Sequence, residues 1–145
     1  MIAVDISQSM QIEDFTPNRL EAAKNVARDF IKGRKQDRIG IVVFSGDAFS
    51  LAPLTTDYEL LNSYINDMNF DMIENRGTAI GSALAVVTNR MRESESKSKV
   101  CILVSDGENT LKSFFLRASI QALKLSLVCF DNSSTNSGGS FLFFS

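Results

Sequence analysis

Three segments of the chain are continuous runs of apolar residues, and amphipathic stretches separate them. The runs cover residues 2–4, 38–44 and 99–105; they are rich in Val and Ile and show no polar alternation. Parallel strands that are covered on both faces have this pattern. The runs therefore predict three buried strands in a largely parallel sheet.

The stretches between the runs have helical periodicity. Apolar side chains recur three or four positions apart in residues 16–33, 55–68 and 78–94, which predicts three amphipathic helices. Leu60 and Leu61 are both expected to face inward, and Thr16 and Thr78 to cap helix N-termini. Residues 49–55 contain Pro53 and are expected to form an edge strand. Strands alternating with helices predict an open α/β fold with right-handed crossovers.

Composition narrows the function classes. The 145 residues fit one domain, and a net charge of −2 gives no basic field for binding nucleic acid. Histidine is absent, which excludes Ser-His-Asp catalysis and any zinc site with histidine ligands. No apolar stretch is long enough to span a bilayer. We therefore expect the chain as given to be soluble and not to insert into a membrane.

The composition changes near the end of the chain. Sixteen of the seventeen acidic residues precede Leu111, and Asp131 alone follows it. We expect residues 1–110 to form the domain. We expect residues 111–145 to be a divergent tail, the frameshifted or truncated end of the same domain.

Oxygen-bearing side chains gather where the predicted strands end. Asp5, Ser7 and Ser9 follow the first run at alternate positions, and in an extended segment such residues point the same way. Asp106 follows the third run, and Thr78 follows Gly77 just before a helix. Ligands of open α/β sheets bind outside the carboxyl ends of the strands. The five side chains are therefore expected to meet around one point.

Two carboxylates and three hydroxyls are suitable ligands for a hard cation such as Mg²⁺, which takes six oxygens and usually keeps several waters. Each residue also has an ordinary interpretation. Asp5 can cap a strand end, Ser7 and Ser9 can be loop hydroxyls, Thr78 can cap a helix, and Asp106 can form a turn. The joint arrangement favours the metal site, with an anionic oxygen of a partner completing the coordination.

These residues resemble a known site. The segments DISQS, GTAIG and SDGEN resemble the metal-ion-dependent adhesion site of von Willebrand factor A-type domains. Residues 2–110 resemble more specifically the A-type domain of the bacterial Bat aerotolerance proteins. The resemblance implies a Rossmann-like, three-layer α/β/α fold with a central, mostly parallel sheet and one antiparallel edge strand, incomplete here at both ends.

The resemblance also implies a cofactor and its ligands. Mg²⁺ (or Mn²⁺) would bind Ser7, Ser9 and Thr78 directly, with Asp5 and Asp106 binding directly or through water. The partner would be a protein that supplies a carboxylate, with sibling Bat membrane proteins as the implied candidates. The parent protein would be membrane-anchored, with this domain in the periplasm or at the membrane surface.

A metal-dependent protein-binding module that is not an enzyme is the favoured interpretation. An Mg²⁺-dependent phosphoryl-transfer enzyme of the haloacid-dehalogenase kind is an alternative, because such enzymes also place an aspartate after the first strand. That chemistry needs a second acid two residues later to protonate the leaving group, and Ser7 stands there. A non-functional remnant is the third alternative.

Overall fold

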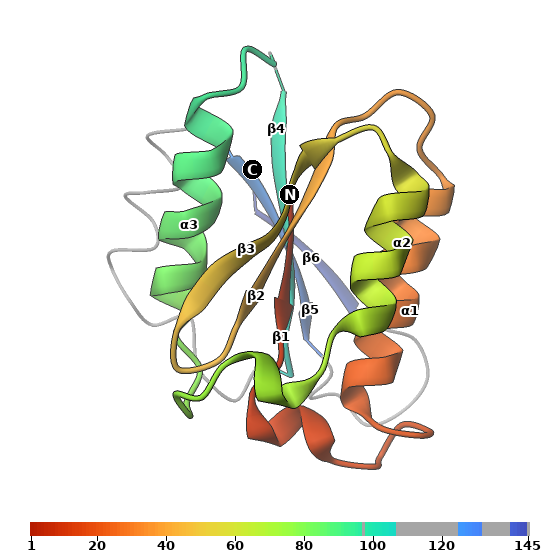
Figure 1. The fold of residues 1–145 in the computed structure, drawn as a ribbon, viewed down its shortest axis with the longest axis vertical. Coiled ribbons are helices and arrows are strands. Elements are labelled where there is room, and N and C mark those ends of the chain that lie inside the picture. Colours follow the sequence, from red (N-terminus) through yellow and green to blue (C-terminus); the bar gives the residue numbers. More distant parts are fainter. Residues whose placement is uncertain (97, 107–124, 132–139, 145) are drawn as a thin grey trace.

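A computed structural model of the chain shows a single six-stranded sheet with helices on both faces (Figure 1). It describes residues 1–96, 98–106, 125–131 and 140–144, the last two ranges by their backbone. The strands are β1 (Ile2–Asp5), β2 (Ile39–Phe44), β3 (Ala48–Thr55), β4 (Lys99–Val104), β5 (Leu125–Asp131) and β6 (Ser140–Phe144). Their order across the sheet is β3-β2-β1-β4-β5-β6.

The sheet is mostly parallel, as predicted. Strand β1 pairs in parallel with β2 and β4, and β4 pairs in parallel with β5. The antiparallel strands β3 and β6 form the two edges, so Pro53 does lie in an edge strand. The expected origin of residues 111–145, as the frameshifted or truncated end of the domain, remains a prediction, and most of these residues lie outside the described part of the chain.

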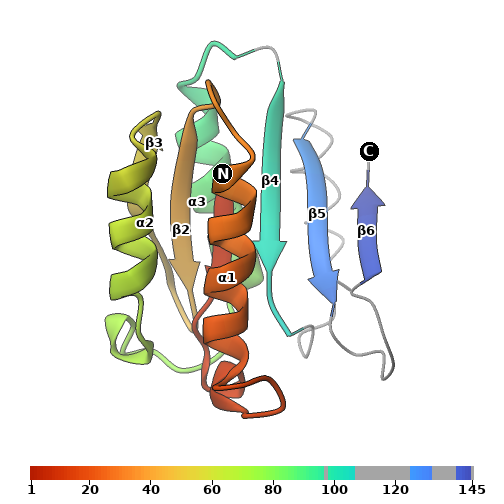
Figure 2. The same cartoon turned by 90° about the vertical axis from the view of Figure 1, so that its right-hand side faces the viewer.

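Two helical layers cover the sheet in the described part of the chain. Helices α1 (Arg19–Lys32) and α2 (Tyr58–Asp67) lie on one face, and α3 (Ile80–Arg92) lies on the other (Figure 2). Alternate residues of β1 serve the two layers: Ile2 and Val4 belong to the core under α1 and α2, whereas Ala3 belongs to the core under α3. Burial on both faces explains why the strand sequences are apolar throughout.

The helices begin at residues other than those predicted. Asn18, not Thr16, caps α1 by accepting a hydrogen bond from the Glu21 amide at 2.9 Å. Helix α3 follows Ala79, which makes no side-chain cap, so Thr78 is not the N-cap that its sequence position indicated. Asparagine competes well with threonine for a cap position, and a loop can leave a threonine one residue too early to cap.

Short 3₁₀ helices complete the connections: η1 (Gln8–Gln11) follows β1 and η2 (Phe70–Met72) follows α2.

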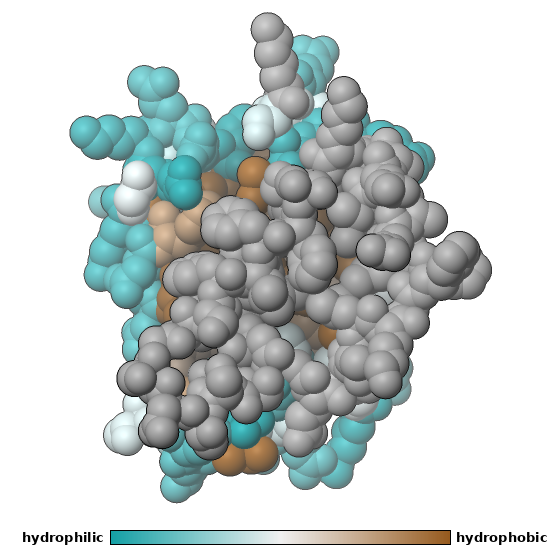
Figure 3. All heavy atoms as spheres, turned by 180° about the vertical axis from the view of Figure 1, so that it is seen from behind, coloured by the Kyte–Doolittle hydropathy of each residue, from teal (hydrophilic) through white to brown (hydrophobic). Residues whose placement is uncertain are grey.

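None of the described helices is long and apolar enough to cross a membrane. Hydrophilic residues line much of the described surface seen from behind (Figure 3). Large apolar side chains that are exposed in the described part are Ile12, Phe15, Phe49, Leu60 and Val100.

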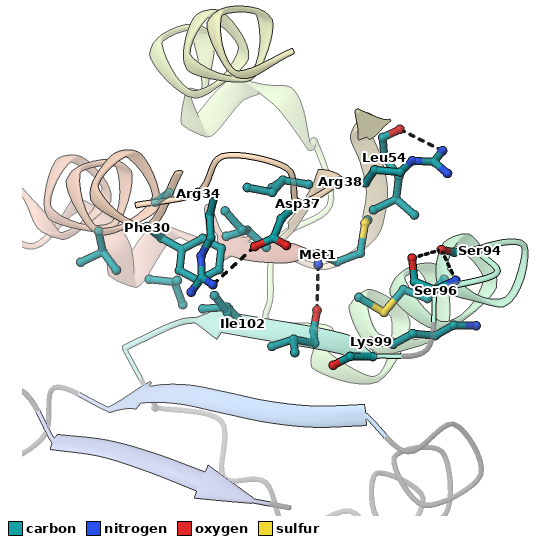
Figure 4. A pocket seen from close by; sticks show the side chains of 18 of the residues that line it. Met1, Phe30, Arg34, Asp37, Arg38, Leu54, Ser94, Ser96, Lys99 and Ile102 are labelled. Atoms are coloured by element: carbon teal, nitrogen blue, oxygen red, sulfur yellow. Dashed lines mark hydrogen bonds and ion pairs between the residues drawn. The ribbon is translucent and has the colours of Figure 1, made fainter. Parts of the chain in front are cut away.

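A hollow of about 800 Å³ lies mainly at the end of the sheet where the central strands β1 and β4 begin (Figure 4). The Met1 amino group donates to the Val100 carbonyl there at 2.8 Å, and the Arg34 guanidinium stacks over the Phe30 ring. The described residues that line this hollow include none of the five candidate metal ligands. The hollow is therefore separate from the candidate site at the other end of the strands.

Leu60 and Leu61 provide a matched test of the core. Leu61 is fully buried, whereas Leu60 is 42% exposed, so the expectation that both face inward was wrong for Leu60. We expect Leu61→Ala to lower the free energy of unfolding by about 2–5 kcal/mol, because it leaves a cavity. Leu60→Ala should change it by less than about 0.5 kcal/mol. Urea unfolding followed by circular dichroism measures both, and equal losses would contradict this core.

Candidate metal site

The site is built around Asp5, the last residue of β1, whose side chain is fully buried. One carboxylate oxygen accepts a hydrogen bond from the Ser7 amide at 2.8 Å. The other accepts from the Ser105 hydroxyl at 2.6 Å. Ser105 directly follows β4, so the Asp5 carboxylate joins the ends of two neighbouring strands.

Ser7 and Ser9 do come together, but not by the expected route. Residues 8–11 form η1, so Ser9 is not on an extended segment and the prediction of simple alternation was wrong. The turn of this 3₁₀ helix nevertheless brings the two hydroxyl oxygens to 3.0 Å from each other. Ser7 is buried and Ser9 is half-buried. The pair therefore presents two hydroxyl oxygens beside the end of β1.

Thr78 is held at the same edge of the sheet through Ser45, which follows β2. The Ala79 amide donates to the Ser45 carbonyl at 2.5 Å, and the Ser45 hydroxyl donates to the Gly77 carbonyl at 3.1 Å. The last residue of β2, Phe44, pairs with Asp5 in the β1–β2 register. Both neighbours of Thr78 are thus bonded to the residue that follows the strand beside Asp5.

Two glycines permit this close approach of loops. A Cβ on Gly46 would lie 2.6 Å from the Arg76 carbonyl oxygen and 2.7 Å from that of Asn75. Gly77 has a φ of 133°, a backbone conformation that favours glycine. The loop that carries Thr78 therefore depends on the absence of side chains at both positions.

Asp106 follows Ser105, and its side chain is 3% exposed. Its Oδ2 atom accepts a hydrogen bond from Nη1 of Arg19, the first residue of α1, at 2.8 Å. The same guanidinium donates to the exposed Asp14 through Nε and Nη2. Arg19 was missed in the sequence because it lies 87 positions from Asp106 and looks like an ordinary helix residue.

Burial controls the electrostatics of the Asp5 carboxyl. Desolvation raises the pKa of this group above its ordinary value, and the hydrogen bonds from Ser105 and Ser7 offset part of that rise. The negative charge of Asp106 raises the pKa of Asp5 further. At the protein surface, the hydrogen bonds from Arg19 lower the pKa of Asp14. A cation beside Asp5 would relieve the unfavourable charge in the buried site.

The donor chemistry fits a hard cation. The candidate ligands offer only carboxylate and hydroxyl oxygens, which suit Mg²⁺ or Mn²⁺. No group of three or more His, Cys, Asp or Glu side chains in the described residues could hold a metal ion. Two carboxylates alone are therefore too few, and hydroxyls such as those of Ser7, Ser9 and Thr78 would have to complete the ligand set.

Residues 1–108 match the sequence profile described as the von Willebrand factor type A domain. A Borreliella burgdorferi relative, an uncharacterized protein, is 35% identical over 108 residues, which are 74% of this chain and 31% of the relative. This chain thus spans less than a third of that relative's length.

Solved structures agree with the profile. BatB from Bacteroides thetaiotaomicron superposes with a TM-score of 0.81 at 26% identity, over 99% of this chain and 78% of that one. An aerotolerance-related membrane protein from Bacteroides fragilis gives a TM-score of 0.80 at 26% identity, over 99% and 79%.

A more distant neighbour is the proximal thread matrix protein 1 of the mussel byssus, solved with a zinc-occupied MIDAS motif. Its TM-score is 0.66 at 22% identity, over 88% of this chain and 36% of that chain. Because the profile covers most of the chain and the fold agrees, this chain belongs to the von Willebrand factor type A domain family, and its similar structures include aerotolerance-related Bat proteins.

Proposed function

We propose that this domain binds a divalent cation, Mg²⁺ or Mn²⁺, and through it a carboxylate side chain of a partner protein. The observation that carries the proposal is the buried Asp5 carboxylate, which lies at the end of β1 and is bonded to the residue before Asp106. The Ser7–Ser9 hydroxyl pair follows β1 directly, and the Thr78 loop is tethered to the end of β2.

The bound ion would supply positive charge that a partner's carboxylate can neutralise. We assign Ser7, Ser9 and Thr78 as neutral ligands, with Asp5 and Asp106 binding directly or through water. Neutral hydroxyls leave more charge on an ion than carboxylates would, so an incoming anionic oxygen gains more from binding. The proposed role is therefore a binding module rather than an enzyme.

The relatives support the setting of this role. The mussel protein's MIDAS motif holds a metal, and the Bacteroides fragilis neighbour is an aerotolerance-related membrane protein. We infer that the parent protein is anchored in a membrane, with this domain in the periplasm or at the membrane surface. Sibling Bat membrane proteins are the proposed partners, each contributing an acidic side chain.

Phosphoryl transfer is less well supported. The second position after Asp5 is Ser7, whose hydroxyl is hydrogen-bonded with that of Ser9 and cannot serve as a proton donor of carboxylic-acid strength. We therefore do not propose an aspartate-based phosphatase reaction for this site.

Asp106→Asn tests the metal site. It removes one of two carboxylates but keeps the size of the side chain and one oxygen for Arg19. We expect the Mg²⁺ affinity to fall by about 10–100-fold, as for other residues that hold a metal or its waters. Isothermal titration calorimetry measures the change. Asp67→Asn, at the exposed end of α2, is the matched control and should bind as the unsubstituted protein does; indistinguishable heats for both variants would reject the site.

Asp5→Asn tests the electrostatic cost of the site. Burial raises the pKa of the Asp5 carboxyl in the folded state above its ordinary value of 3.8. The charge on Asp5 therefore destabilises the fold at pH values above this raised pKa, and it has no effect at pH values below the pKa of the unfolded state. Asparagine keeps the acceptor for the Ser7 amide and can donate to Ser105. In EDTA at pH 7, Asp5→Asn should raise the unfolding free energy, and the difference should disappear towards pH 3.

Mg²⁺ should make the unsubstituted protein more stable than Asp5→Asn. At a concentration of about 100 times Kd, it should stabilise the unsubstituted protein by about 2.7 kcal/mol and leave Asp5→Asn unchanged. Urea unfolding with and without Mg²⁺ measures both effects. Equal stabilisation of the two proteins by Mg²⁺ would remove Asp5 from the site.

Gly46→Ala tests the loop that carries Thr78. The new Cβ would collide with backbone carbonyls of residues 75 and 76, and so displace that loop. We expect Mg²⁺ affinity to fall by about tenfold, or about 1.4 kcal/mol, although no proposed ligand is changed. Gly81→Ala in α3 is the control, because a Cβ there meets nothing within 4 Å. Unchanged affinity in Gly46→Ala would show that the Thr78 loop does not contribute to binding.

A further inference from the structure

Arg19 connects two carboxylates of different kinds. Its Nη1 donates to Oδ2 of the buried Asp106 at 2.8 Å. Its Nε and Nη2 donate to Asp14 at 2.8–3.0 Å, where the Asp14 side chain is 43% exposed. One guanidinium thus ties a candidate metal ligand to an acid at the protein surface.

The chain holds this guanidinium firmly in place. The Arg19 amide donates to the Ile12 carbonyl at 3.1 Å, and Asn18 before it caps α1. The Arg19 side chain is only 20% exposed. A guanidinium is always charged and bonds in a fixed planar fork, so it is a permanent positive charge beside Asp106.

The sign of this charge bears on metal binding. Asp5 and Asp106 together bring two negative charges to the proposed site, and Arg19 offsets one of them. Asp14 in turn offsets part of the charge of Arg19. Resting on the metal site proposed above, we infer that Arg19 is a positioning residue that holds Asp106 and lowers the domain's own affinity for the ion. A partner's carboxylate then contributes strongly to the stability of the complex.

A purely structural role of Arg19 would have different consequences for ion binding. If Arg19 only held Asp106 in place, its loss would weaken ion binding and leave the response to added carboxylate unchanged. If it limits the negative charge of the site, its loss strengthens ion binding and reduces the gain from added carboxylate, because the ion then retains less charge for an external ligand.

The experiment measures Mn²⁺ affinity by electron paramagnetic resonance of the free ion. Each protein is titrated in sodium chloride and then in sodium acetate of the same ionic strength, acetate being the carboxylate probe. Arg19→Gln should bind Mn²⁺ roughly threefold or more tightly in chloride and gain less from acetate. Arg19→Lys keeps the charge and should resemble the unsubstituted protein in both salts.

Asp14→Asn should change the Mn²⁺ affinity in the opposite direction. It removes the acid that partly neutralises Arg19, so Mn²⁺ affinity should fall more than in Glu13→Gln, which removes an equally charged, exposed neighbour. Unchanged or weaker Mn²⁺ binding by Arg19→Gln would overturn this inference and leave the proposed metal site standing. Equal Mn²⁺ affinities of Asp14→Asn and Glu13→Gln would do the same. Failure of the unsubstituted protein to bind Mn²⁺ would instead overturn the proposed metal site and this inference with it.

Discussion

The hydrogen bond between the Ser105 hydroxyl and the buried Asp5 carboxylate joins the two central strands of the sheet at their carboxyl ends. The backbone ladder between β1 and β4 stops at Val4 and Val104, so side chains carry the connection beyond it. An ionised carboxylate without water is unfavourable, and two donated hydrogen bonds compensate for this only in part. Burial therefore disfavours the ionised form of Asp5, and a cation bound beside it would favour that form.

Most of the architecture could be predicted from the sequence because burial on both faces leaves a strong pattern. Every residue of β1 and β2 is buried, and the uninterrupted apolar runs reflect this. Helix starts were predicted less well. Asn18 rather than Thr16 caps α1, and α3 begins after Ala79 rather than after Thr78, because local backbone geometry decides where each helix begins. Leu60 was misplaced for another reason: adjacent helix residues point about 100° apart, and α2 turns Leu61 to the core and leaves Leu60 partly exposed.

The position of the candidate ligands in the fold was largely predictable from the sequence, but the hydrogen bonds that connect them to other residues were not. Asp5 and Asp106 could be placed because acids after buried strands must lie at the carboxyl edge of a parallel sheet. The contacts of Ser105, Ser45 and Arg19 could not, because each joins residues 32 to 100 positions apart through a single side chain. No periodicity records such contacts. Ser7 and Ser9 meet through η1, whose turn the alternation argument did not include.

The balance of charge at the site has a consequence for the proposed function. A site with several carboxylates would hold a divalent ion tightly and leave it little charge for another ligand. Here the candidate ligands include two carboxylates, of which Asp106 is bonded to a fixed guanidinium, and the other candidate ligands are neutral hydroxyls. An ion held in this way has most to gain from one further anionic oxygen. No third acid gathers at this end of the sheet in the described part of the chain. The proposed function assigns the further oxygen to a partner's carboxylate, so ion binding and partner binding would be mutually dependent.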